Sequence, residues 1–192
     1  MKTNFYLFAA VAPVVLMLAS CGPQLDMASV PMSAGNAGGA AAPRSDGSLT
    51  GQIHSQVNSH RGALGKSALP RHTGLDRLAQ QHSEFMVRNR GKIEGGLTHY
   101  GFEERALAAQ RLMGMSNVAE NIATCSGSFS SPSSTLVGAW KNSSGHAKNM
   151  KSTWDVTGVG VAVAPDGTVF ATQIFASQSH SHMAITNRMR QF

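Results

Sequence analysis

The chain has 192 residues, of which 42% are hydrophobic, and it carries a formal net charge of +6. This length fits one folded domain with extensions and is enough to bury a hydrophobic core. The 16 Lys and Arg residues are scattered along the sequence and not clustered, which favours a solvated basic surface and argues against a nucleic-acid-binding protein.

Residues 1–20 are typical of a secretory signal peptide. Lys2 precedes an apolar run from Phe5 to Ala19. This run is too short, and too interrupted by Pro13, to cross a bilayer as a stable helix. We therefore expect the chain to be exported from the cytoplasm.

Residues 18–22 read Leu-Ala-Ser-Cys-Gly, which resembles the lipobox of bacterial lipoproteins. The resemblance implies cleavage before Cys21, a lipid thioether on its sulfur and fatty acylation (palmitate) of its amine, which anchors the chain in the cell envelope. Gly22 favours the outer membrane. The alternative is an ordinary secreted protein with an incidental cysteine. With Cys21 lipidated, Cys125 is the only thiol left, so no intramolecular disulfide forms, and we expect Cys125 to be a small buried apolar residue.

Residues 21–47 consist mainly of Ala, Gly, Ser, Pro and Met. This composition buries too little apolar surface to fold, so we expect a flexible tether with a root-mean-square reach of roughly 30 Å. The tether would hold a domain at residues 48–176 just clear of a membrane. We expect the polar residues 177–192 to form a tail outside the fold.

Apolar residues recur at helical spacing in four segments of the domain. The expected helices begin at Ser48, Thr73, Phe102 or Glu103, and Ser131-Pro132. Ser48 and Thr73 are suitable N-caps, and Pro132 suits a first helical position. Gly114 ends the third helix.

The last third of the domain changes to the alternating pattern of strands. Val159 to Val163 and Val169 to Phe175 form a hairpin around a turn at Asp166-Gly167,. A short extended segment at residues 118–123 adds a third strand. We therefore expect an α+β fold, an α-β-α sandwich with a three-stranded antiparallel sheet packed between helices.

Three polar clusters centred on His99, Glu120 and His146 contain the residue types of a binding or catalytic site. Two imidazoles and a carboxylate can bind Zn²⁺ and leave a fourth position for water, whose pKa the metal lowers. The three residues are too far apart in sequence to form a compact metal motif. Three interpretations of these residues therefore stay open: a structural hydrogen-bond cluster, a metal or ligand site, and a catalytic centre.

A set of motifs in a fixed order points to a family. The motifs are Ala79-x-x-His82-x-x-x-Met86, Thr98-His99, Glu120-Asn121-Ile122, Trp140-x-x-Ser143-x-x-His146-x-x-Asn149, Gly158-Val159-Gly160-Val161 and Thr172-Gln173-x-Phe175. This set resembles the bacterial branch of the CAP superfamily, the cysteine-rich secretory, antigen 5 and pathogenesis-related proteins, whose module is also called the SCP domain. The resemblance covers residues 49–176 or so.

The resemblance implies a cavity lined by two histidines and two acids. His99, Glu120 and His146 match three of these residues, and Ser143 stands where eukaryotic members have the second acid. A glutamate at the start of the third helix, Glu103 or Glu104, is an alternative fourth group. The three matched residues are then also the candidate metal ligands.

Two other patterns indicate packing. His82 lies on an apolar helix face, which favours a packed histidine with one hydrogen bond over a ligand. Gly158-Val159-Gly160 opens a strand, so it indicates close packing and not a phosphate loop,.

A serine nucleophile is weakly supported. Ser143 and Ser144 lie close to His146, and Glu120 could orient the imidazole,. A serine at a helix end beside Gly145 is more often a cap or turn residue.

The sequence therefore favours a membrane-anchored envelope protein that binds a lipid, a metal or a cell-wall component between His99, Glu120 and His146. A metal-assisted hydrolase or peptidase of the envelope and a structural or protein-interaction module are the alternatives. We expect a binding module more than an enzyme because Ser143 replaces an acid.

Overall fold

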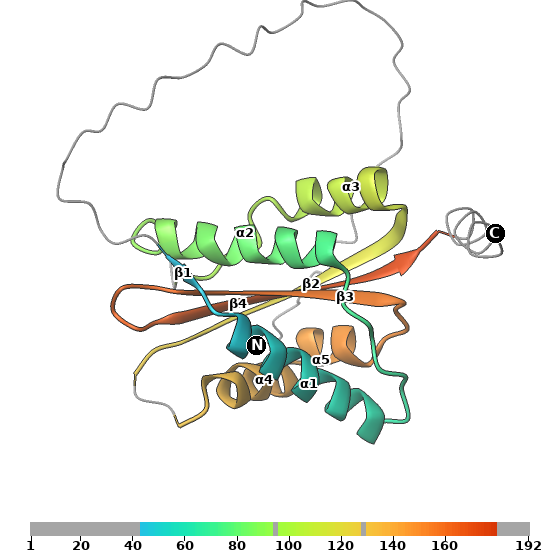
Figure 1. Ribbon diagram of the computed structural model, residues 1–192, viewed down its shortest axis with the longest axis horizontal. Coiled ribbons are helices and arrows are strands. Elements are labelled where there is room, and N and C mark those ends of the chain that lie inside the picture. The colour runs from blue at the N-terminus through green and yellow to red at the C-terminus, as the bar shows by residue number, and fades with distance from the viewer. Residues whose placement is uncertain (1–42, 94–95, 128–129, 180–192) are drawn as a thin grey trace, which may run out of the picture. The chain divides into compact units, whose positions relative to one another are not determined.

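The computed structural model describes residues 43–93, 96–127 and 130–179, and Figure 1 shows a sheet between two layers of helices. Helices α2 and α3 cover one face, and α1, α4 and α5 cover the other. The elements are β1 (Arg44–Ser45), α1 (Gly47–Ala63), α2 (Thr73–Asn89), α3 (Phe102–Met113), β2 (Met115–Cys125), α4 (Pro132–Asn142), α5 (Ser144–Lys151), β3 (Val156–Val163) and β4 (Val169–Gln178). The expected α+β class and α-β-α sandwich are confirmed.

Several expectations concern residues outside this range. The signal peptide, the lipobox with Cys21, most of the tether and all but the first residues of the tail lie outside the described residues. Within the described part, no helix is long and apolar enough to cross a membrane.

The sheet has four antiparallel strands in the order β1-β3-β4-β2. The expected hairpin is confirmed as β3 and β4, with Val163 opposite Val169. The expected three strands are joined by β1, in which Arg44 and Ser45 pair with Val163 and Ala162. Strand β1 lies in the range expected to be a tether, and two residues are too few to show a strand pattern in the sequence.

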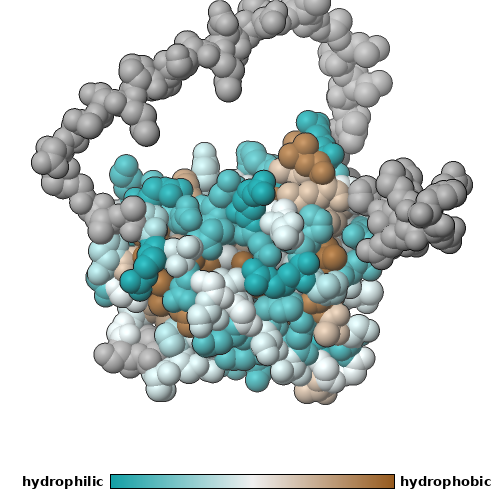
Figure 2. Space-filling view, viewed as in Figure 1, coloured by the Kyte–Doolittle hydropathy of each residue, from teal (hydrophilic) through white to brown (hydrophobic). Residues whose placement is uncertain are grey.

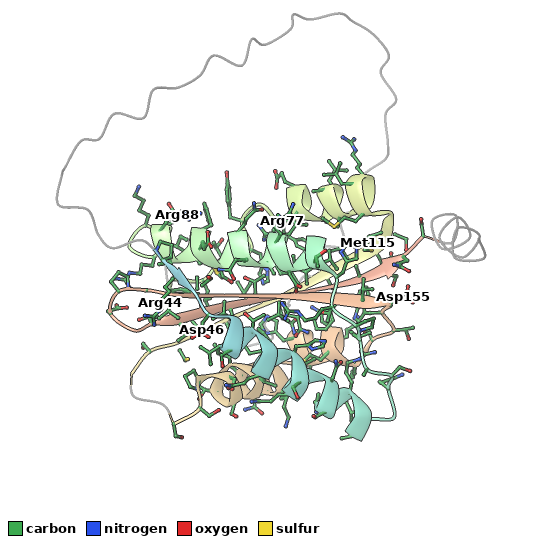
Figure 3. All side chains as sticks on the ribbon, in the orientation of Figure 1. Arg44, Asp46, Arg77, Arg88, Met115 and Asp155 are labelled. Atoms are coloured by element: carbon green, nitrogen blue, oxygen red, sulfur yellow. The ribbon has the colours of Figure 1, made fainter. Side chains whose placement is uncertain are left out.

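The start of α1 differs from the expectation. The N-cap is Asp46, whose Oδ1 accepts a hydrogen bond from the Leu49 N–H at 3.0 Å, and not Ser48. Figure 3 shows Asp46 at this end of the helix. An aspartate at this position also stabilises the positive end of the helix dipole. In α2, Thr73 is the first helical residue and not the cap.

Two other helix ends are confirmed. Helix α3 ends at Gly114 in the left-handed conformation, with φ of 67°. Helix α4 begins after Ser131, which accepts from the Ser134 N–H, and has Pro132 at its first position.

One helix was not expected. The polar cluster around His146 forms the short helix α5, so this histidine lies on a helix and not on a loop.

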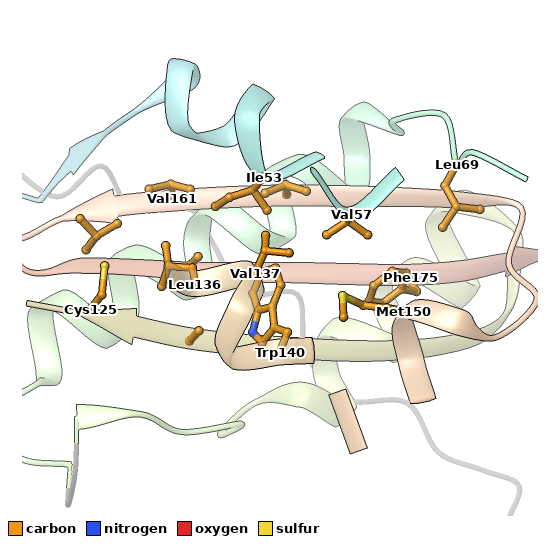
Figure 4. Close-up of a cluster of buried hydrophobic side chains, with 14 residues drawn as sticks. Ile53, Val57, Leu69, Cys125, Leu136, Val137, Trp140, Met150, Val161 and Phe175 are labelled. Carbon is orange, nitrogen blue, oxygen red and sulfur yellow. The ribbon is translucent and has the colours of Figure 1, made fainter. Parts of the chain in front are cut away.

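The larger hydrophobic core lies between the sheet and the layer of α1, α4 and α5 (Figure 4). It contains Ile53 and Val57 of α1, Trp140 of α4 and Phe175 of β4, all 0% exposed. Cys125 is a free buried thiol in this core, as expected. Smaller clusters on the other face lie under α2.

Strand β3 lies unusually close to α2 because two of its residues have no side chain. A Cβ atom at Gly160 would overlap backbone atoms of Ala79 and Gln80, and one at Gly158 would overlap the backbone of Leu75. The Gln80 side chain accepts a hydrogen bond from the Val161 N–H at 3.0 Å. The helix therefore covers backbone donors of β3 that β1 is too short to pair, and the expected close packing is confirmed.

We predict that Gly160→Ala lowers the free energy of unfolding by at least about 3 kcal/mol, because the new methyl group meets helix backbone that cannot move alone. Gly51→Ala in α1 is the control, since a Cβ there meets nothing within 4 Å; it should stabilise the helix by about 0.5–1 kcal/mol. Urea unfolding of both variants tests this. Equal midpoints would contradict the close contact between α2 and β3.

Candidate functional site

The three expected site residues lie together at the free edge of the sheet, formed by β2. His99 comes from the segment before α3, Glu120 from β2 and His146 from α5. His99 Nδ1 donates to Glu120 Oε1 at 2.9 Å. The rings of His99 and His146 are 6.4 Å apart between centroids and tilted by 42°. We call His99, Glu120, His146 and the Arg105 described below the His–Glu cluster.

Local turn chemistry places His99. Thr98 Oγ1 accepts from the Tyr100 N–H at 3.0 Å, and the Phe102 N–H donates to the His99 carbonyl at 2.9 Å. Gly101 has φ of 74°, a conformation that glycine adopts without strain,. The segment therefore makes a tight turn into α3 and presents the His99 ring, whose side chain is 51% exposed.

Arg105 completes the cluster and was not identified from the sequence. Its Nε donates to Glu120 Oε2 and its Nη2 to Glu120 Oε1, both at 2.8 Å. Its Nη1 donates to the Tyr100 carbonyl at 2.9 Å. The Arg105 side chain is 12% exposed and that of Glu120 is 1% exposed, so this is a buried bidentate ion pair. The sequence offered one signal that Arg105 points toward the sheet: it lies one helical turn before Ala109, the buried residue of α3, and therefore on the same face of the helix,.

Glu120 is held as a carboxylate. Burial alone would raise its pKa, but hydrogen bonds from His99 and Arg105, together with the charge of Arg105, outweigh burial and lower the pKa below its ordinary value,. An ionised Glu120 can only accept hydrogen bonds, so His99 carries its proton on Nδ1 and its other ring nitrogen, Nε2, is left for a ligand.

His82 is the packed histidine that the sequence predicts. It is 2% exposed, and its Nε2 donates to the Thr98 carbonyl at 2.7 Å. Burial is the main cause that lowers its pKa. His82 Nε2 lies 3.9 Å from Glu120 Oε1. This histidine therefore holds the segment that carries His99 and also lies against the cluster.

Amide side chains fix α5 to β2. Asn149 Nδ2 donates to Asn121 Oδ1 at 2.9 Å and to the Glu120 carbonyl at 3.3 Å. Asn121 Nδ2 donates to the His146 carbonyl at 3.2 Å. The asparagines of two expected motifs thus set the distance between His146 and Glu120.

The expected candidates for a fourth group either cap a helix or are exposed. Ser143 joins the end of α4 to the start of α5, which is the cap or turn role favoured from the sequence. Glu103 and Glu104 are exposed in the first turn of α3. The residue of α3 that binds Glu120 is Arg105, which follows Glu104 in the sequence and is a cation where an acid was expected.

The cluster does not fit a metal centre that uses Glu120 as a ligand. Both oxygens of the carboxylate accept hydrogen bonds from Arg105, which already supplies a positive charge there. In the described ranges, no group of three or more His, Cys, Asp and Glu side chains is placed to hold a metal ion. The metal site expected at His99, Glu120 and His146 stays a prediction, and the hydrogen bonds from Arg105 argue against Glu120 as one of its ligands.

The model of the CAP family, described as the cysteine-rich secretory protein family, matches residues 54–175. The chain belongs to this family. A search of the curated proteins finds no match. The CAP match runs from within α1 to within β4 and contains the whole His–Glu cluster.

Solved structures are similar in fold. An outer surface protein of Borrelia burgdorferi superposes with a TM-score of 0.57 at 17% identity, covering 71% of this chain and 99% of its own. A cysteine-rich secretory protein of Staphylococcus aureus gives a TM-score of 0.51 at 17% identity. That match covers 68% of this chain and 39% of the staphylococcal one, so this chain resembles less than half of that protein.

We predict that Arg105→Ala destabilises this CAP domain by about 3 kcal/mol, because it leaves a buried carboxylate without its cation. Arg111→Ala on the exposed side of the same helix should change stability by less than about 0.5 kcal/mol. Chemical denaturation of both variants makes the comparison.

A second variant separates charge from packing. The pair replacement Arg105→Met with Glu120→Leu should recover most of the lost stability, since it removes both charges together. If the pair replacement is as unstable as Arg105→Ala, the ion pair is not the cause.

Proposed function

We propose that this CAP domain is a lipid-anchored module of the bacterial cell envelope that binds an amphiphilic ligand, a lipid or a lipid-linked wall component, at the His–Glu cluster. The polar part of the ligand contacts His99 and His146. The observation that carries the proposal is the state of Glu120: Arg105 satisfies the carboxylate, whereas the His99 ring is half exposed.

This arrangement favours binding over hydrolysis. A general base must accept a proton from water, and the lowered pKa and bidentate partner of Glu120 make it a poor acceptor,. With its proton on Nδ1, the His99 ring can accept a hydrogen bond at Nε2 from a ligand hydroxyl, and the His146 ring can donate to or accept from a ligand oxygen.

An apolar pocket beside the cluster supports an amphiphile. It has a volume of about 200 Å³ and is lined by Leu78, Phe85 and Tyr100, together with His82 and Arg105, which also lie against Glu120. The rings of Phe85 and Tyr100 are stacked with centroids 5.7 Å apart. Tyr100 is 73% exposed, so its ring offers apolar surface that a ligand chain can cover.

The envelope location rests on the sequence and on one similar protein. The lipobox-like residues 18–22 imply a lipid anchor. The Borrelia protein with this fold is described as an outer surface protein, which supports a location outside the cytoplasm.

Ligand binding is tested with monodecanoylglycerol, an amphiphile whose hydroxyl groups can donate to His99 Nε2, on the full-length protein in detergent-free nanodiscs followed by NMR. Tyr100→Ala and His99→Ala should each weaken binding by roughly fivefold, the loss expected for one neutral hydrogen bond or a comparable apolar contact. Leu64→Ala, which removes an exposed apolar residue at the end of α1, should have no effect.

Two outcomes would reject this function. Equal affinity of all variants for monodecanoylglycerol would show that the ligand does not bind at the cluster. Hydrolysis of a decanoate ester by the wild type that Glu120→Gln abolishes, with the fold intact, would instead establish the hydrolase.

The anchor is tested by growing the producing bacterium with radiolabelled palmitate. We expect label on the mature wild-type protein and none on Cys21→Ser, because the sulfur and the new amino terminus are both lost as acylation sites. Label that persists in Cys21→Ser would show that residues 18–22 are not a lipobox.

A further inference from the structure

The two helical layers differ in charge. Helices α1, α4 and α5 contain no Asp or Glu, and they carry Arg61, Lys141, Lys148 and Lys151. The acidic residues of the described helices are Asp76, Glu84, Glu103 and Glu104, all in α2 and α3. Helices α2 and α3 carry as many basic residues, Arg77, Arg88, Arg105 and Arg111, so what distinguishes the layer of α1, α4 and α5 is that its helices contain no acid to balance their charge.

Acidic residues at the ends of this layer are engaged elsewhere. Asp46 caps α1, Asp155 accepts from the Gln178 N–H at 2.8 Å, and Asp166 pairs with Arg90 at 2.7 Å. Among the residues that the structure describes, Lys141 has no ion-pair partner. Its charge is therefore uncompensated by the protein.

A groove between α1 and α4 lies in this layer. Its volume is about 470 Å³, within the range of small-molecule sites,. Gln56, Ser59 and His60 of α1 face Ser134 and Lys141 of α4 across it. The groove thus combines one ammonium, two hydroxyls, an amide and an imidazole, all of which can donate hydrogen bonds, and its lining contains no carboxylate among the described residues,.

Side-chain hydrogen bonds hold the two walls at a fixed distance. Gln56 Nε2 donates to Ser133 Oγ at 3.0 Å, and Ser133 Oγ donates to Gln52 Oε1 at 2.8 Å. Below them, Val57 and Val137 pack in the core. A ligand would meet a preformed site and would not need to order its walls.

His60 and Lys141 are the titratable groups that face this groove in the described part of the chain. Burial lowers the pKa of His60, and the nearby charge of Lys141 lowers it further. Arg61 turns inward instead, since its Nη1 donates to the carbonyls of Met150 at 2.6 Å and Ser152 at 2.8 Å. The imidazole and the ammonium therefore share one site without an anion between them.

We propose that this groove is a second ligand site, specific for a phosphate ester. Lys141 supplies the charge, and Ser59, Ser134, Gln56 and His60 donate to the phosphate oxygens. A phosphate fills only part of the volume, so the remaining space accepts the glycerol or sugar that carries it. The groove shares no lining residue with the His–Glu cluster, so this site does not depend on the function of the cluster.

Glycerol 3-phosphate is the probe, titrated into the full-length protein while NMR follows the His60 ring. Binding should raise the pKa of His60, because a bound dianion stabilises the imidazolium. Lys141→Gln should weaken binding by roughly tenfold, the loss of one charge-assisted hydrogen bond, and remove the His60 response. Lys148→Gln is the matched control: it removes the same charge from the same layer outside the groove and should change affinity less than about twofold.

Three outcomes would overturn the site: no binding at millimolar probe, equal loss in both lysine variants, or binding that leaves His60 unchanged. Two further probes, inorganic phosphate and phosphatidylglycerol vesicles, show whether the natural phosphate ester is soluble or polymer-borne or is a lipid headgroup. A soluble or polymer-borne phosphate predicts Lys141-dependent binding of the soluble esters alone, and a lipid headgroup predicts vesicle binding that Lys141→Gln loses and Lys148→Gln keeps.

Discussion

The buried pair of Glu120 and Arg105 joins the parts of the domain that make the site. Its carboxylate binds Arg105 of α3 and His99 of the preceding turn, and the backbone carbonyl of the same residue accepts from Asn149 of α5. A charge with 1% exposure is stable only when such partners surround it,. The turn into α3 and the start of that helix therefore depend on the Glu120 side chain, and α5 is attached to the backbone of the same residue.

The same pair decides what chemistry the site favours. A carboxylate that is fully bound by a guanidinium is a weak base and a poor metal ligand, so the reactive atoms left at this edge are the ring nitrogens of His99 and His146. These groups suit recognition of a polar headgroup, and the neighbouring rings of Phe85 and Tyr100 suit its apolar part,. The proposed binding role therefore rests on how Arg105 neutralises Glu120.

The two proposed ligand sites have different surroundings. On one face, α2 and α3 hold the ion pair and the apolar pocket; on the other, α1 and α4 form a groove with cationic and hydroxyl side chains. Figure 2 shows apolar surface gathered over the end of α3, where Leu112 is 80% exposed. A three-layer domain can keep two such sites apart because the sheet and its core separate them.

The sequence by itself determined the α+β class, the hairpin around Asp166-Gly167, the caps at Ser131 and Gly114, and the roles of Gly158 and Gly160, because periodicity and local backbone preferences are encoded over a few residues,. It also named His99, Glu120 and His146. Only the tertiary structure decided that Arg105, and not an acid, completes the cluster, that β1 joins the sheet and that α1, α4 and α5 share an acid-free face. These features pair residues far apart in the chain, and their partners are fixed only when the helices pack on the sheet.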